Sequence, residues 1–329
     1  MRKRIARSAF VIVAAMLAGG VPGCARSTPA WQNRGGPPRV VVTIPALDSF
    51  VRNVGRERVG VICLCTTKGP HHYEYNPTDA IVLRDADLFL AIGLTLDDKF
   101  ADAMQDESQN ARLRYVKLGE RLPKKLLLKG EEHEEGKDDK GHEHEHGEYD
   151  PHIWLGIPQA VALVEMIRDQ LSEIDREHAK EYADNAAAYV ETLKKLQADG
   201  KEKLKDKKDR KIVAFHESLA YFADSFGLEI VDAIERAPGE EPLPGHLAKL
   251  VEKCKAHHVR VIAVEPQYPQ GSSAEILKKD VKDIELVVVD PLETADTADL
   301  REDQKELKSK DWYEKKMRQN VAALAKSLP

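Results

Sequence analysis

Histidines and carboxylates are concentrated between Gly130 and Leu155, in the stretch GEEHEEGKDDKGHEHEHGEYDPHIWL. Imidazole and carboxylate groups are ligands for transition metals, so this composition indicates metal binding. The first part has almost nothing apolar to bury and cannot form a core, whereas the second part fixes His152 between a proline and Ile-Trp-Leu. We expect the first part to be a low-affinity metal collector or a solvated spacer, and His152 to belong to a structured site. The auxiliary histidines of the first part are His133, His142, His144 and His146.

Further candidate ligands follow short apolar runs that read as strands. In open parallel sheets, ligands bind beyond the carboxyl ends of the strands. A single histidine there is more often a cap, but several at equivalent positions in two halves of a chain indicate one shared site. Pro70 stiffens the backbone at His71, so we favour His71 over its neighbour His72. The residues past the runs are His71 after 59–65, His216 after 211–215, Glu265 after 259–264 and Asp290 after 286–289.

Three imidazoles and one carboxylate form a tetrahedral set that suits Zn²⁺. We therefore predict a site made of His71, His152, His216 and Asp290. All four positions would be filled by protein, and a closed site of this kind binds metal without activating water. The sequence also lacks an HExxH helix, a cysteine-rich zinc module and a GxSxG elbow, so we expect no enzyme. The rival from another class is an exported zinc hydrolase, which needs three protein ligands and an exchangeable water.

The elements that must position these ligands alternate between strand-like and helical segments, which predicts βαβ units and parallel sheets. We predict an α/β fold with two lobes, each a parallel sheet flanked by helices, at 39–172 and 209–329. The loop 130–149 belongs to the first lobe. Between the lobes, the segment 173–208 carries an apolar residue every three or four positions, which predicts one long, rigid connecting helix.

Four motifs resemble the metal-binding signatures of ZnuA/TroA-like solute-binding proteins, the capture subunits of bacterial zinc and manganese ABC importers. They are GPHHYEYNPTD (69–79), DPHIWL (150–155), AFHESLAYFADSFGL (214–228) and VVVDPL (287–292).

The resemblance implies a TroA-like fold, the same four ligands, and an ABC permease with its ATPase as partners. Histidine at the third ligand position, where manganese-type members tend to have glutamate, favours Zn²⁺ over Mn²⁺, as does the acidic histidine-rich loop. Manganese or broad divalent-metal binding is the alternative within the family, and a secondary role as a surface adhesin stays open. The sequence departs from the family pattern at Tyr75-Asn76 and at Gly156-Ile157-Pro158, which concerns loop shape and no proposed ligand.

The N-terminal segment 1–24 has the form of an export signal. Four basic residues precede a short apolar run, which is too short to span a bilayer, and Val-Pro-Gly-Cys follows. This ending resembles a lipoprotein signal with Cys24 as the lipidated residue, and 25–38 would then be a tether to the membrane. An ordinary secretory signal is the alternative. Either interpretation predicts an extracytoplasmic protein, in the periplasm or at the cell surface.

Composition limits the remaining possibilities. The 329 residues carry a formal net charge of −6, with 42% hydrophobic and 32% charged residues, as in a well-solvated globular protein. A net negative charge offers no binding surface for nucleic acid, so we expect no nucleic-acid partner. Separately, we expect the chain to be a monomer.

Besides Cys24, three cysteines remain: Cys63, Cys65 and Cys254. An odd number leaves at least one thiol unpaired, and we expect these cysteines to be buried thiols. A bridge between Cys254 and one of the other two stays open.

Overall fold

The computed structural model describes residues 36–130, 147–235, 239, 242–266, 272–302 and 306–329, and within them eight short strands form two separate sheets. Several of these strands are almost wholly buried apolar runs, as expected where helices cover both faces. The first sheet contains β1 (Arg39–Val42), β2 (Gly60–Cys63), β3 (Leu88–Ala91) and β4 (Arg114–Lys117). The second contains β5 (Lys211–His216), β6 (Glu229–Glu235), β7 (Val261–Val264) and β8 (Glu285–Val288).

Both sheets have the same topology. All their strand pairs are parallel, in the order β2-β1-β3-β4 and β6-β5-β7-β8. Numbered within its own half, each sheet therefore reads 2-1-3-4, although the two halves show no evident repeat in sequence. The prediction of two parallel α/β lobes is confirmed, and the carboxyl ends of all strands in a sheet lie at one edge, where loops can carry ligands.

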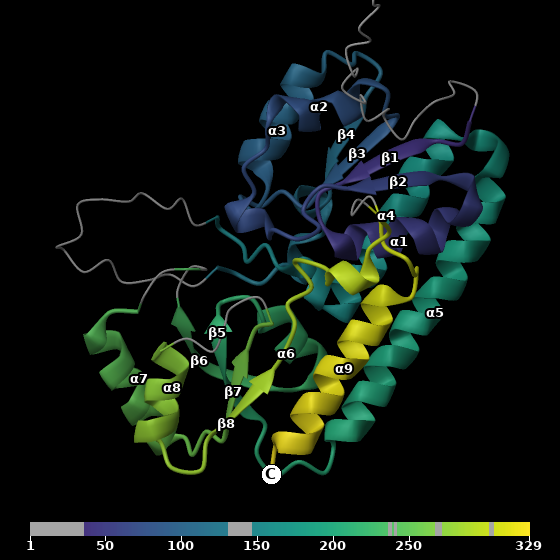
Figure 1. Ribbon diagram of the computed structural model, residues 1–329. Helices are drawn as coiled ribbons and strands as arrows, with labels where there is room; N and C mark the ends of the chain where they lie inside the picture. Colours follow the sequence, from purple (N-terminus) through teal and green to yellow (C-terminus); the bar gives the residue numbers. More distant parts are fainter. Residues whose placement is uncertain (1–35, 131–146, 236–238, 240–241, 267–271, 303–305) are drawn as a thin grey trace, which may run out of the picture.

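Helices cover both faces of each sheet. In the first lobe, α2 and α3 lie on one side of the sheet and α1 and α4 on the other (Figure 1). In the second lobe, α7 and α8 lie on one side, and α6 and α9 on the other (Figure 1). The helices are α1 (Pro45–Gly55), α2 (Pro77–Arg84), α3 (Asp98–Ser108), α4 (Ile157–Ile174), α5 (Ala179–Leu204), α6 (Ala220–Phe226), α7 (Pro244–Ala256), α8 (Ser272–Asp280) and α9 (Trp312–Ser327).

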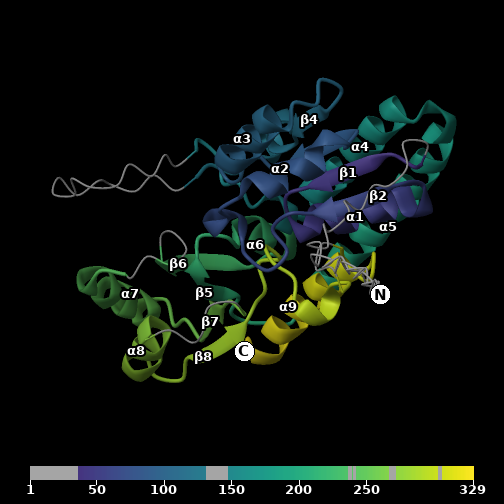
Figure 2. The ribbon, with the colours of Figure 1, turned by 45° about the horizontal axis from the view of Figure 1, so that its top comes forward.

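The predicted long helix is α5, which has 26 residues and runs beside both sheets next to α9 (Figures 1 and 2). Its buried side chains, among them Tyr182, Tyr189, Leu193 and Leu196, repeat at helical spacing and bury one stripe of the helix. That stripe packs against α1, α4 and α9, which joins the lobes through a continuous core. Among the described residues, no helix combines the length and the apolarity needed to cross a membrane.

The second sheet divides its side chains between two cores. Val213 and Phe215 of β5 face a separate cluster formed with α7 and α8, whereas Ile212 and Ala214 face the main core. This alternation is the two-residue period of a strand buried on both faces. Only the main core therefore connects the second sheet to α5, α9 and the first lobe.

His216 is the last residue of β5, and α6 begins only at Ala220. Gly227 ends that helix in the left-handed conformation (φ 70°) that glycine adopts without strain. The expectation of buried thiols is confirmed, because Cys63, Cys65 and Cys254 are buried and free.

Candidate metal centre

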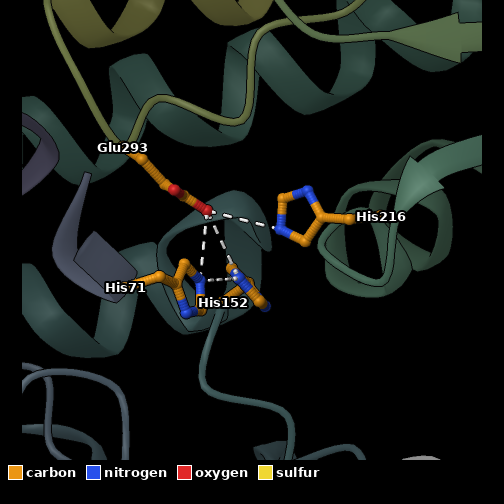
Figure 3. Close-up of side chains that lie close together, drawn as sticks. All are labelled: His71, His152, His216 and Glu293. Carbon is orange, nitrogen blue, oxygen red and sulfur yellow. Dashed lines mark hydrogen bonds and ion pairs between the residues drawn. The ribbon is translucent and has the colours of Figure 1, made fainter. Parts of the chain in front are cut away.

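Four side chains from distant parts of the chain converge on one point: His71, His152, His216 and Glu293 (Figure 3). One possible ligand atom from each lies within 4.8 Å of the others. Glu293 Oε1 lies 3.6 Å from His71 Nε2, 3.4 Å from His152 Nε2 and 3.5 Å from His216 Nε2. His71 Nε2 and His152 Nε2 are 3.3 Å apart.

Four of the six separations between these atoms are those of a metal-binding tetrahedron, and all six are within 4.8 Å. Ligand atoms at about 2.0–2.2 Å from a central ion are about 3.3–3.6 Å from one another. The four distances above fall in that interval. Glu293 Oε1 and His216 Nε2 are also buried without a hydrogen-bond partner. Buried polar atoms are rarely left in this way, and a metal ion at the centre would engage both.

The first-lobe histidines are held by short, rigid turns. His71 lies in a single 3₁₀ turn, Pro70–His72, which follows β2 and starts with proline. His152 directly precedes a second 3₁₀ turn, Ile153–Leu155, whose three side chains are fully buried. Proline and an apolar anchor restrict the backbone on either side of the imidazoles, as the DPHIWL motif indicated.

The second-lobe ligands lie at strand ends. His216 is brought to the site by the end of β5, and Glu293 by the loop after β8. That loop turns sharply at Leu292, which is buried with a φ of 59°. A left-handed leucine is sterically unfavourable and persists only where its surroundings fix it.

The structure does not bring Asp290, the expected fourth ligand, into the cluster. Its carboxylate accepts a hydrogen bond from the Leu292 amide and lies 3.1 Å from Lys316 Nζ. The Asp290 amide donates a hydrogen bond to Asn320 Oδ1 in α9, and the Asp290 carbonyl accepts one from Asn320 Nδ2. Asp290 thus fixes the loop, and the turn at Leu292 brings Glu293 to the site instead.

Two carboxylates orient the imidazoles from behind. Asp150 Oδ1 lies 2.8 Å from His152 Nδ1 and also accepts from the His152 amide. Glu265 Oε1 is hydrogen-bonded to His216 Nδ1. When Nδ1 donates to a carboxylate, Nε2 remains free to bind metal, as in the carboxylate–histidine–metal arrangement. From the sequence we expected Glu265 to lie past a strand but assigned it no role. We did not single out Asp150, although it belongs to the DPH motif.

Burial and charge shift the pKa values of the site strongly. Burial alone would lower the pKa of His152, but Asp150 and Glu293 outweigh it and raise that pKa to about 9. Glu265 and Glu293 likewise outweigh burial and raise the pKa of His216 to about 10. The pKa of His71 is lowered, chiefly by burial. Burial would raise the pKa of Glu293, but the surrounding imidazoles hold it well below its ordinary value.

The centre is reached from a cavity of about 1300 Å³ that is lined by residues of both lobes. His71, His152 and His216 are on its wall, together with Lys99 and Glu217. The side chain of His71 is 22% exposed, whereas those of His152, His216 and Glu293 are 5%, 1% and 2% exposed. An ion entering from the cavity would therefore meet His71 first.

Five predicted functional residues lie outside the part of the chain that the structure describes. They are the auxiliary histidines His133, His142, His144 and His146, and the lipidation residue Cys24.

The chain is similar to known zinc-uptake proteins over most of its length. The family model described as ZnuA, zinc-uptake complex component A, periplasmic, matches residues 40–327. The chain is 29% identical over 263 residues to the zinc-binding lipoprotein AdcA of Streptococcus pneumoniae, covering 80% of this chain and 51% of AdcA. It therefore spans about half the length of that relative.

A second curated relative is named for a different metal. The manganese-binding lipoprotein MntA of Halalkalibacterium halodurans is 27% identical over 266 residues, covering 80% of this chain and 81% of MntA. Among solved structures, the Zn(II)-bound ZnuA-like domain of S. pneumoniae AdcA has a TM-score of 0.69 at 27% identity. That comparison covers 89% of this chain and 99% of the domain.

Proposed function

Because the chain belongs to the ZnuA family of periplasmic zinc-uptake components, we propose that it captures Zn²⁺ at His71, His152, His216 and Glu293 and delivers it to the permease of an ABC importer. The family consists of solute-binding proteins of metal uptake systems, so the chain is not an enzyme. This excludes the alternative prediction that the chain is an exported zinc hydrolase.

The observation that carries the proposal is the cluster of four donor atoms, three of them on buried residues. Glu293 Oε1 lies 3.4–3.6 Å from three Nε2 atoms and has no hydrogen-bond partner. Four protein ligands leave no position for an activated water, which suits capture and release. The metal is here the cargo, and the chain's task is to bind it tightly and selectively.

The ligand types support zinc over manganese. Imidazole nitrogens suit Zn²⁺, whereas Mn²⁺ is better served by carboxylate, carbonyl and water oxygens. Three of the four donors are imidazole nitrogens, and the two carboxylates nearest the histidines, Asp150 and Glu265, hydrogen-bond to Nδ1 atoms. The similarity to a manganese-binding relative keeps Mn²⁺ as the alternative cargo.

The proposed path of the ion begins at the cavity and ends behind His71. The residues 131–148 would act as an auxiliary collector of metal, and Cys24 would anchor the chain to the outer surface of a membrane, near a permease and its ATPase. The chain would act as a monomer. Release would require a movement of the lobe that contributes His216 and Glu293, or of a loop that carries a ligand.

A competition titration tests the proposal. The metal-free chain is titrated with Zn²⁺ and with Mn²⁺ against a chromophoric chelator, together with the variants Glu293→Gln and Asp290→Asn. We expect one tight Zn²⁺ site, weaker Mn²⁺ binding and a loss of at least about 100-fold in Zn²⁺ affinity for Glu293→Gln, since a direct ligand should matter more than the outer partners that cost 10–100-fold. Asp290→Asn is the matched control, with a smaller loss. Equal losses in both variants, or tighter Mn²⁺ binding, would contradict the assignment.

A further inference from the structure

Gly69 lies directly against the carboxylate of Glu293. A Cβ atom built on Gly69 would be 2.9 Å from Glu293 Oε2, closer than real Cβ contacts allow, and 3.8 Å from Glu293 Cβ. Glu293 therefore turns one oxygen toward the three imidazoles and the other toward a glycine of the opposite lobe. The space left by the missing side chain is where Oε2 lies.

The backbone of Gly69 does not itself require glycine. Its φ of −65° and ψ of 160° are in the extended region that any residue adopts, and they suit a residue that precedes proline. The usual reason for glycine in a turn, a positive φ, is absent here. What distinguishes glycine at this position is close approach to a neighbouring group.

The main chain around Glu293 is fixed, so an added methyl group would have to move the end of the Glu293 side chain, which carries the carboxylate. On one side, the Pro291 carbonyl accepts a hydrogen bond of 2.8 Å from Trp154 Nε1. On the other side, the Ala295 amide donates a hydrogen bond of 2.7 Å to the Thr66 carbonyl in the first lobe. The main chain is thus held on both sides of Glu293, and the side chain is only 2% exposed.

We propose that Gly69 is a positioning residue for the metal site: its missing side chain leaves the space in which Glu293 seats one carboxylate oxygen while it presents the other to the ion. This inference rests on the proposed function and adds a determinant of affinity that binds no metal. A methyl group at position 69 displaces or rotates the carboxylate and weakens metal binding, although all four ligands are still present.

The test is a double-mutant cycle for Zn²⁺ binding, measured on the full chain by competition with a chelator. Gly69→Ala should weaken binding by about 10- to 100-fold, the range found for residues that orient ligands. In a Glu293→Ala background the same substitution should change the affinity by less than about threefold, because the group with which it collides is gone. Gly245→Ala is the matched control, since a Cβ there meets nothing within 4 Å.

The outcomes separate this inference from the proposed function. If the unaltered chain binds Zn²⁺ tightly and Gly69→Ala binds equally well, or if the loss is the same in both backgrounds, the inference is wrong and the function stands. If the unaltered chain lacks a tight site, both are wrong. If Gly69→Ala does not fold, recovery of folding in the double variant supports the collision with Glu293, and failure of both to fold refutes it.

Discussion

Replacing Asp150 with asparagine should reduce by about one the number of protons released when the metal binds. A histidine must be neutral at the nitrogen that holds the metal, so every ligand that is protonated in the metal-free protein loses a proton on binding. Burial alone would lower the pKa of His152, and the neighbouring carboxylates, Asp150 foremost, raise it to about 9. Without Asp150, the balance shifts toward neutral His152.

The magnitude follows from the charges of the site. At about pH 7.5, His152 and His216 are protonated because their pKa values are about 9 and about 10, while the lowered pKa of His71 leaves it neutral. Binding therefore releases about two protons per ion, and the apparent affinity should rise about 100-fold per pH unit until the pH approaches the pKa of His152. The apparent affinity should therefore change with pH above about 6.5, the ordinary pKa of histidine.

The assay is isothermal titration of Zn²⁺ in buffers with different heats of ionisation, where the slope of the observed enthalpy gives the number of protons exchanged. We expect about two for the unaltered chain, about one for Asp150→Asn, and about one for Glu265→Gln, which acts in the same way on His216. Asp290→Asn is the control and should still give about two, because its carboxylate contacts Lys316. Release of no protons from the unaltered chain, or an unchanged count in Asp150→Asn, would show that Asp150 does not keep His152 protonated in the metal-free protein.

Three further predictions concern stability and the histidine-rich segment. Without metal, the free energy of unfolding, measured in urea, should fall as the pH rises from about 6.5 to about 10, because raised histidine pKa values stabilise the folded state only while those histidines are charged; a flat profile would contradict this. Arg52→Ala should destabilise the fold by about 3–5 kcal/mol because it leaves the fully buried carboxylate of Asp48 without its partner. The exposed pair formed by Arg58 should contribute no more than about 1 kcal/mol, so Arg58→Ala serves as the control in the same denaturation series. A chain lacking 131–148 should keep one tight Zn²⁺ site by competition titration, and loss of that site would assign the segment a primary role.

The strands and the meeting of the three histidines could be predicted from sequence. Runs such as Arg39–Val42 and Val261–Val264 are β-branched without alternation, which is the pattern of a strand buried on both faces. Since ligands bind beyond the carboxyl ends of parallel strands, His71 and His216, which follow such runs, were expected to converge with His152 of the DPHIWL motif, and the structure brings the three together.

The fourth member of the cluster could not be predicted by the same rule. The rule selects the first polar residue after β8, which is Asp290, but a left-handed turn at Leu292 presents Glu293 instead. That turn depends on contacts with Trp154 and Asn320, which are far away in the sequence, and leucine has no local preference for it. The strand order that the two sheets share could not be predicted from the sequence either, because strand order is set by tertiary packing.

X-ray absorption spectroscopy of the zinc-loaded chain would distinguish Glu293 from Asp290 as the fourth ligand, since it reports the ligands around the ion itself. We expect a four-coordinate Zn²⁺ with three imidazole nitrogens at about 2.0–2.1 Å and one carboxylate oxygen at about 2.0–2.2 Å. In Glu293→Gln the carboxylate contribution should disappear, and in Asp290→Asn the spectrum should not change. A water in the fourth position of the unaltered protein, or a spectrum that changes with Asp290 and not with Glu293, would contradict this expectation.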